Sequence, residues 1–141
     1  MKLHVLFALL IGLLVGSCCS PMVLEPVVVE AKEETFDEEL FNFVINRLME
    51  ECPLNDDAMV KVMVITSARW GMTMWSHKYG YEITLEARQQ MHSILDVLEH
   101  EWAHAMVWDS HQDSDHGPLW GVAWAKAYRV SLQAQRDYYA Q

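Results

Sequence analysis

Apolar side chains recur at every third or fourth position near the start of the folded part of the chain. They are Phe36, Leu40, Phe43, Val44 and Leu48. This spacing predicts an amphipathic helix that ends near Glu51, because Pro53 cannot continue it. Thr35 and Glu38 fit a capping box in which Thr35 is the N-cap, and the acidic residues of the first turn favour the positive end of the helix dipole.

The pattern then changes to short apolar runs and alternating positions. Residues 60–65, 69–76 and 81–85 predict three strands. Gly71 indicates a turn or a bulge, and residues 77–80 indicate a connecting loop. Together with helices on either side, these segments predict an α+β domain with a small antiparallel or mixed sheet of three or four strands.

Residues 86–108 contain no glycine or proline and predict a long helix. Its main apolar stripe consists of Met91, Leu95, Leu98 and Trp102, and the apolar residues near the opposite side are Val97, Val107 and Trp108. A helix that is apolar on two sides is buried over much of its length. His100 and His104 lie on the side of Val97 and need partners, because an unpaired buried imidazole is costly.

A polar stretch at residues 109–115 predicts a loop, and residues 116–118 (His-Gly-Pro) open a last helix. Trp120, Trp124 and Tyr128 recur every four residues and predict the apolar stripe of that helix. We expect the tryptophans at positions 102, 108, 120 and 124 to belong to the core rather than to a substrate-binding surface.

The composition narrows the classes of function. The chain has 141 residues, enough for one domain, and a formal net charge of −10. Such an acidic chain is poorly suited to binding nucleic acid through phosphate neutralisation, whereas it attracts cations.

The first residues have the organisation of an export signal. Lys2 precedes an apolar run from Val5 to Val15, which has about the length of a signal-peptide core. The sequence Val15-Gly16-Ser17-Cys18 resembles the lipobox of bacterial lipoproteins. This resemblance implies cleavage before Cys18 and a lipid anchor on that cysteine, which holds the protein at a membrane.

This interpretation divides the chain into a signal peptide (residues 1–17), a tether (18–34) and a folded domain (35–141). Residues 27–29 alternatively predict a first strand. The anchor would place the domain in the cell envelope, and Cys19 in place of an aspartate favours the outer membrane. Without use of the lipobox the protein would be secreted. Cys19 and Cys52 are then left to pair or to stay free.

Residues 100–104 (His-Glu-Trp-Ala-His) form an HExxH motif inside the long predicted helix. Histidines four residues apart project from one face of a helix and can hold one ion, and zinc accepts neutral imidazole. Glu101 lies about 100° round the helix from His100, where it can reach a water on the metal as a general base. The alternative is a helix with two hydrogen-bonded core histidines and a solvated Glu101.

A catalytic zinc site normally needs a third protein ligand. His116 lies twelve residues beyond His104, and a loop of that length can return to the same helix face. His111, Asp113 and Asp115 compete with it, and Asp115 can instead orient a ligand imidazole. The residues alone leave this choice open.

Three segments together resemble the SprT-like zinc metallopeptidases. They are Ile83–Leu85, Asp96–Ala105 and Asp115–Trp120, within a similarity over about residues 36–130. The resemblance implies a zincin-like α+β fold in which a small sheet packs on the HExxH helix, with helices at both ends of the domain. It implies His100, His104 and His116 as zinc ligands, Glu101 as the catalytic acid and base, and a peptide or protein as the substrate.

The chain also departs from that family. No cysteine follows Cys52, whereas members that act on DNA often add a cysteine-rich zinc ribbon, and Leu119 stands where the family often has Glu. Together with the negative charge, this argues against a role on DNA. The residues His77, Tyr79, Tyr81 and His92 lie near the motif in sequence, and nothing singles out one of them as an oxyanion donor.

Two other classes of function fit the same features. One is a non-catalytic envelope lipoprotein that binds zinc through the three histidines and uses its sheet as an interaction surface. The other is a metal-free adhesion or assembly module. Within the enzyme class, the same ligands would serve hydrolysis of another amide, such as a cell-wall peptide.

Overall fold

The computed structural model describes residues 36–54, 58–66, 69–108 and 116–141. In chain order its elements are α1 (Glu38–Glu51), β1 (Val60–Ile65), β2 (Gly71–Ser76), β3 (Gly80–Glu86), α2 (Met91–Met106) and α3 (Pro118–Tyr139). The predicted α+β class with a small sheet is thereby confirmed.

The sheet is mixed, with the strand order β1-β3-β2. β1 runs parallel to β3, with Val60 opposite Tyr81, and β2 runs antiparallel to β3, with Ser76 opposite Gly80. Gly80 has a φ of +72° at the end of the hairpin turn, and a Cβ there would overlap the backbone of Met59. A glycine is therefore required at this position.

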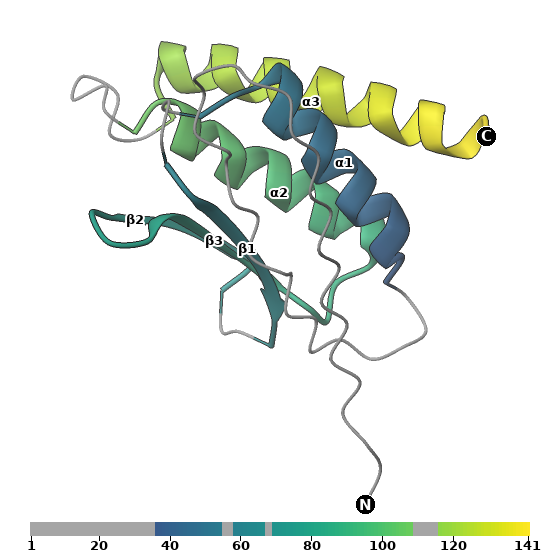
Figure 1. The fold of residues 1–141 in the computed structure, drawn as a ribbon, viewed down its shortest axis with the longest axis horizontal. Coiled ribbons are helices and arrows are strands. Elements are labelled where there is room, and N and C mark those ends of the chain that lie inside the picture. The colour runs from purple at the N-terminus through teal and green to yellow at the C-terminus, as the bar shows by residue number, and fades with distance from the viewer. Residues whose placement is uncertain (1–35, 55–57, 67–68, 109–115) are drawn as a thin grey trace, which may run out of the picture.

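The three helices gather on one side of the sheet (Figure 1). α2 contacts β2, β3 and α3, so it occupies the middle of the domain, and α1 packs against α3. The largest fully buried side chains include Trp102 of α2, Tyr81 of β3 and Phe41 of α1. Because α2 is covered on several sides, its buried polar residues are held in defined surroundings.

The start of α1 differs from the prediction. Asp37 is the N-cap, and its Oδ1 accepts a hydrogen bond of 2.9 Å from the backbone N–H of Leu40. The predicted cap, Thr35, lies outside the described residues, and the helix begins only at Glu38. An aspartate caps a helix as well as a threonine does, so the motif alone did not decide between the two positions.

The start of α2 was also predicted too early. Glu86 still belongs to β3, where it lies opposite Ile65, and the N–H of Ala87 donates to the Ile65 carbonyl at 2.9 Å. These groups take part in the sheet, so they cannot join a helix. Gly71 is neither a turn nor a bulge, because it begins β2 in regular register with Leu85.

The predicted apolar stripe of α3 was wrong. Trp124 and Tyr128 are each 41% exposed, and Trp120 is only half-buried. The buried face consists instead of Ala123, Ala127, Val130, Ser131 and Ala134. These small side chains let α3 approach both α1 and α2 closely. Trp102 is buried as predicted, whereas Trp108 is 41% exposed.

Several predictions fall outside the described residues. They concern the signal peptide, Cys18, the tether, Cys19 and the loop at residues 109–115. Cys52 is a free, buried thiol whose pKa is raised by burial. Among the helices that the structure describes, none is long and apolar enough to cross a bilayer.

Candidate metal site and adjoining cleft

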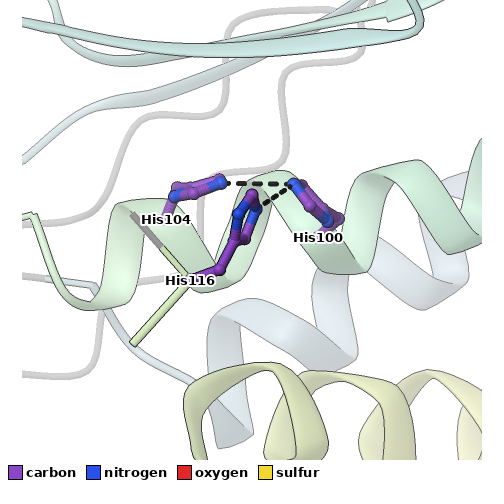
Figure 2. A group of neighbouring side chains, drawn as sticks. All are labelled: His100, His104 and His116. Carbon is purple, nitrogen blue, oxygen red and sulfur yellow. Dashed lines mark hydrogen bonds between the residues drawn. The ribbon is translucent and has the colours of Figure 1, made fainter. Parts of the chain in front are cut away.

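Three histidines from two parts of the chain meet at one point. His100 and His104 lie one turn apart on α2, and His116 comes from the residue pair that precedes α3. The Nε2 atom of His100 lies 3.2 Å from Nε2 of His104 and 3.1 Å from Nε2 of His116 (Figure 2). His116, one of the candidate third ligands that the sequence left open, is thus brought to the pair.

The spacing of the nitrogens suits a metal ion. One ligand nitrogen from each histidine lies within 4.8 Å of the others. Two imidazole nitrogens bound tetrahedrally to zinc at about 2.0–2.1 Å are about 3.3 Å apart. The distances of 3.1 and 3.2 Å are close to that value, so these three residues can form a metal site. A single cation would engage all three nitrogens at once.

The backbone at His116 explains how it reaches the site. Its φ is +44°, in the left-handed region that non-glycine residues seldom adopt. Gly117 is the N-cap of α3, and Pro118 occupies the first turn, where its missing N–H is not needed. Strained conformations of this kind persist where the surrounding structure requires them, often at functional sites. The competing candidates His111, Asp113 and Asp115 lie outside the described residues.

The surroundings of His100 favour its neutral imidazole. Burial lowers the pKa of His100, an effect that the charge of Glu101 opposes and His116 reinforces. The ring of Trp120 packs on all three histidines, with centroid distances of 4.9 Å to His100, 5.6 Å to His104 and 4.5 Å to His116. Neutral imidazole is the form that binds metals.

Glu101 lies on the β2 side of the helix and is only 7% exposed. Thr73 Oγ1 is 2.7 Å from Glu101 Oε2 and 2.9 Å from the Glu101 carbonyl oxygen. A Cβ on Gly71 would lie 2.7 Å from Glu101 Oε1 and would overlap Val97. The carboxylate is therefore confined between the helix and two residues of β2.

An open cleft of about 420 Å³ adjoins the histidines. His100 and Glu101 both line it, and Trp70 and Trp124 stand at its sides. The cleft gives a ligand access to one imidazole of the histidine cluster and to the buried carboxylate at the same time. A space of this volume can admit a small ligand or one side chain of a larger ligand.

The other candidates from the sequence do not gather here. His77, Tyr79 and His92 are exposed, and Tyr81 is buried under the edge of Trp108. None of these four is among the described residues that line the cleft. The structure thus brings no oxyanion donor from this group to the site.

Sequence reasoning missed three residues of the site. Gly71 and Thr73 are two positions apart on β2, so they share a face of the strand, but the pattern does not show that this face meets Glu101. Trp120 was assigned to the core, whereas it packs on the histidines, and its buried Nε1 has no hydrogen-bond partner among the described residues.

In comparisons with known proteins, no family model, no curated protein and no solved structure matched the chain. Function is therefore inferred from the geometry of the site and from the sequence resemblance.

Proposed function

We propose that this protein is a zinc-dependent peptidase with a zincin-like domain. The observation that carries the proposal is the convergence of His100, His104 and His116 while Glu101, on the same helix, stays out of the nitrogen cluster. This separation of three ligands from one carboxylate is what a hydrolytic zinc site requires.

The donor set fits zinc rather than a harder cation. Imidazole nitrogen is a common zinc ligand, whereas calcium and magnesium prefer oxygen. Three protein ligands leave a fourth position for a small molecule, as in catalytic zinc sites. When bound, zinc supplies a Lewis acid that polarises a carbonyl group and lowers the pKa of water.

Glu101 supplies the proton transfers. Its Oε2 is held by Thr73, while its Oε1 lies beside Gly71, which also lines the cleft. The carboxylate takes a proton from the attacking water and later gives it to the nitrogen of the leaving amine, so that water is added across the peptide bond. Its confinement removes the freedom to rotate away from this position.

The leader suggests where this chemistry takes place. The lipobox-like sequence would anchor the mature protein through Cys18, with residues 18–34 as a tether. We therefore place the peptidase in the cell envelope, where it would act on peptides or proteins. Nucleic acid is not expected as a partner of this acidic chain.

Metal content and hydrolysis, measured on the full chain, test the proposal. We expect about one zinc per chain and chelator-sensitive hydrolysis of an unfolded protein such as casein. Glu101→Gln should retain zinc and lose hydrolysis by about a hundredfold or more, because it removes the general base. Glu50→Gln, at an exposed position of α1, is the matched control and should behave as the wild type.

Two results would contradict the proposal. Full hydrolysis by Glu101→Gln would remove the role of the carboxylate. Zinc binding without hydrolysis by the wild type would favour the non-catalytic zinc-binding lipoprotein instead.

A further inference from the structure

Two exposed tryptophans flank the cleft beside the histidines. Trp70, just before β2, is 72% exposed, and Trp124 on α3 is 41% exposed. Indoles bury a large area when they pack in a core, so their exposure at one cleft is unusual for residues that only stabilise the fold. Most of the Trp70 indole is open to solvent, whereas one face of the Trp124 indole is stacked on Trp120, with ring centroids 5.7 Å apart, which leaves its other face for a ligand.

The charged side chains that line the cleft are both acidic. Asp96 lies one turn before His100 on α2, is exposed, and lines the cleft together with Glu101. None of the described residues that line the cleft is Lys or Arg. The excess of acidic residues over the whole chain adds to this field, since the formal net charge is −10.

The nearest arginine in sequence is directed elsewhere. Arg69 Nη1 lies 3.7 Å from Met72 Sδ. Side chains alternate along a strand, so Met72 lies on the opposite face of β2 from Gly71 and Thr73, which meet Glu101. Arg69 is also not among the described residues that line the cleft with Asp96.

Indole faces next to a carboxylate form a site for a cation. A guanidinium or ammonium group is attracted by the face of tryptophan, and a planar guanidinium also stacks on it. The apolar side chain of Val97, which also lines the cleft, can pack against the methylene stem of such a residue. The volume of about 420 Å³ is ample for one long side chain.

We propose that this cleft binds an arginine or lysine side chain of the peptide substrate, with the cation between Trp70 and Trp124 and near Asp96. The proposal rests on the proposed peptidase function, because it takes the cleft as the place where the substrate approaches His100 and Glu101. An apolar side chain would contact the indoles but would gain nothing from the carboxylate.

Blocked hexapeptides that differ at one position test the proposal. The position carries Arg, its neutral isostere citrulline, or Phe. We expect the wild type to cleave the Arg peptide with a kcat/KM about tenfold above that of the citrulline peptide. Equal values for these two peptides, or a preference for Phe, would overturn the assignment.

Two variants test whether Asp96 and Trp124 cause the preference for the Arg peptide. Asp96→Asn should reduce the preference for Arg over citrulline severalfold, and Trp124→Ala should lower kcat/KM for the Arg peptide by about threefold or more. Glu50→Gln and Tyr139→Ala are the matched controls, since Glu50 is exposed on α1 and Tyr139 is an exposed aromatic residue at the end of α3 that is not among the described residues lining the cleft. An unchanged preference in both test variants would contradict the proposal.

A measurement of peptide binding tests the cation site independently of the peptidase function. Glu101→Gln should bind the Arg peptide more tightly than the citrulline peptide in a calorimetric titration. If it does so while the wild type cleaves nothing, the cation site stands and the peptidase function fails. If the wild type cleaves all three peptides equally, the peptidase function stands and the cation site fails.

Discussion

Helix α2 buries one glutamate at its contact with α3 and another at its contact with β2. Glu99, on the α3 side, is 1% exposed, and Glu101, on the β2 side, is 7% exposed. Each carboxylate meets a hydroxyl group, from Ser131 for Glu99 and from Thr73 for Glu101. The two residues are two positions apart, and yet they lie in different surroundings.

The contact between α2 and α3 is closed to solvent at Glu99. Oε2 of Glu99 has no hydrogen-bond partner among the described residues. Burial raises the pKa of Glu99 to about 7, and the hydrogen bond from Ser131 opposes this only in part. At the contact with β2, Glu101 lines an open cleft beside His100. A buried carboxylate becomes useful for chemistry where a ligand can reach it, and elsewhere it is a cost to stability.

After Glu101 itself, the largest effect is expected from Thr73, which is proposed to act through Glu101 as a positioning residue. Thr73→Val keeps the shape of the side chain and removes the hydroxyl that donates to Glu101 Oε2. A hydrogen bond to a charged group contributes about 1.5–3 kcal/mol, so kcat should fall about tenfold or more with little change in KM. Steady-state kinetics on a casein-derived peptide measure this split.

The activity of Thr73→Ser distinguishes a role of the Thr73 hydroxyl in positioning Glu101 from a role of the side chain in packing. Thr73→Ser retains the hydroxyl and loses a methyl group, and it should recover most of the activity that Thr73→Val loses. If the serine variant is as slow as the valine variant, the hydrogen bond is not what matters at this position.

A smaller effect, on stability and activity together, is expected from Gly71→Ala. The added Cβ would lie 2.7 Å from Glu101 Oε1 and would overlap Val97, so β2 or α2 must shift. Overpacking of this kind costs about 1–3 kcal/mol, which urea unfolding can measure. The displaced carboxylate should also slow hydrolysis.

Gly121→Ala is the matched control for this change. Gly121 lies inside α3, and a Cβ there would meet no atom within 4 Å. Alanine should therefore stabilise the helix by up to about 1 kcal/mol and leave hydrolysis unchanged. Equal effects of the two substitutions would show that the contact of Gly71 with Glu101 is unimportant.

Part of the fold and of the candidate site could be predicted from the sequence alone. The pairing of His100 with His104 depends only on helix geometry, because residues four apart share a face. The strand at Val60–Ile65 and the hairpin that follows also came from local patterns. Such features are predictable because neighbouring residues along the chain determine them.

Features that depend on packing were not predictable. The tryptophans and the alanines of α3 both recur at helical spacing, and the pattern did not show that the alanine face packs on α1 and α2. The position of His116 depends on its own left-handed backbone conformation, which no periodicity reveals. Its assignment as a ligand came from the resemblance, and the structure brings the three nitrogens together.

The smallest expected effect on hydrolysis concerns the closed contact, where the change is in stability. Glu99→Gln replaces the carboxyl by a neutral amide of similar shape, which should raise the free energy of unfolding at pH 8 by up to about 3 kcal/mol. An unfolded glutamate ionises near 4.5, whereas Glu99 in the folded protein ionises near 7. Between these values the folded state binds more protons, so the wild type loses stability as the pH rises through this window. Urea unfolding with a chelator present should show the variant's advantage at pH 8 shrinking at pH 5, while Glu50→Gln shows none at either pH. An advantage that is independent of pH would mean that the charge of Glu99 is not what destabilises this contact.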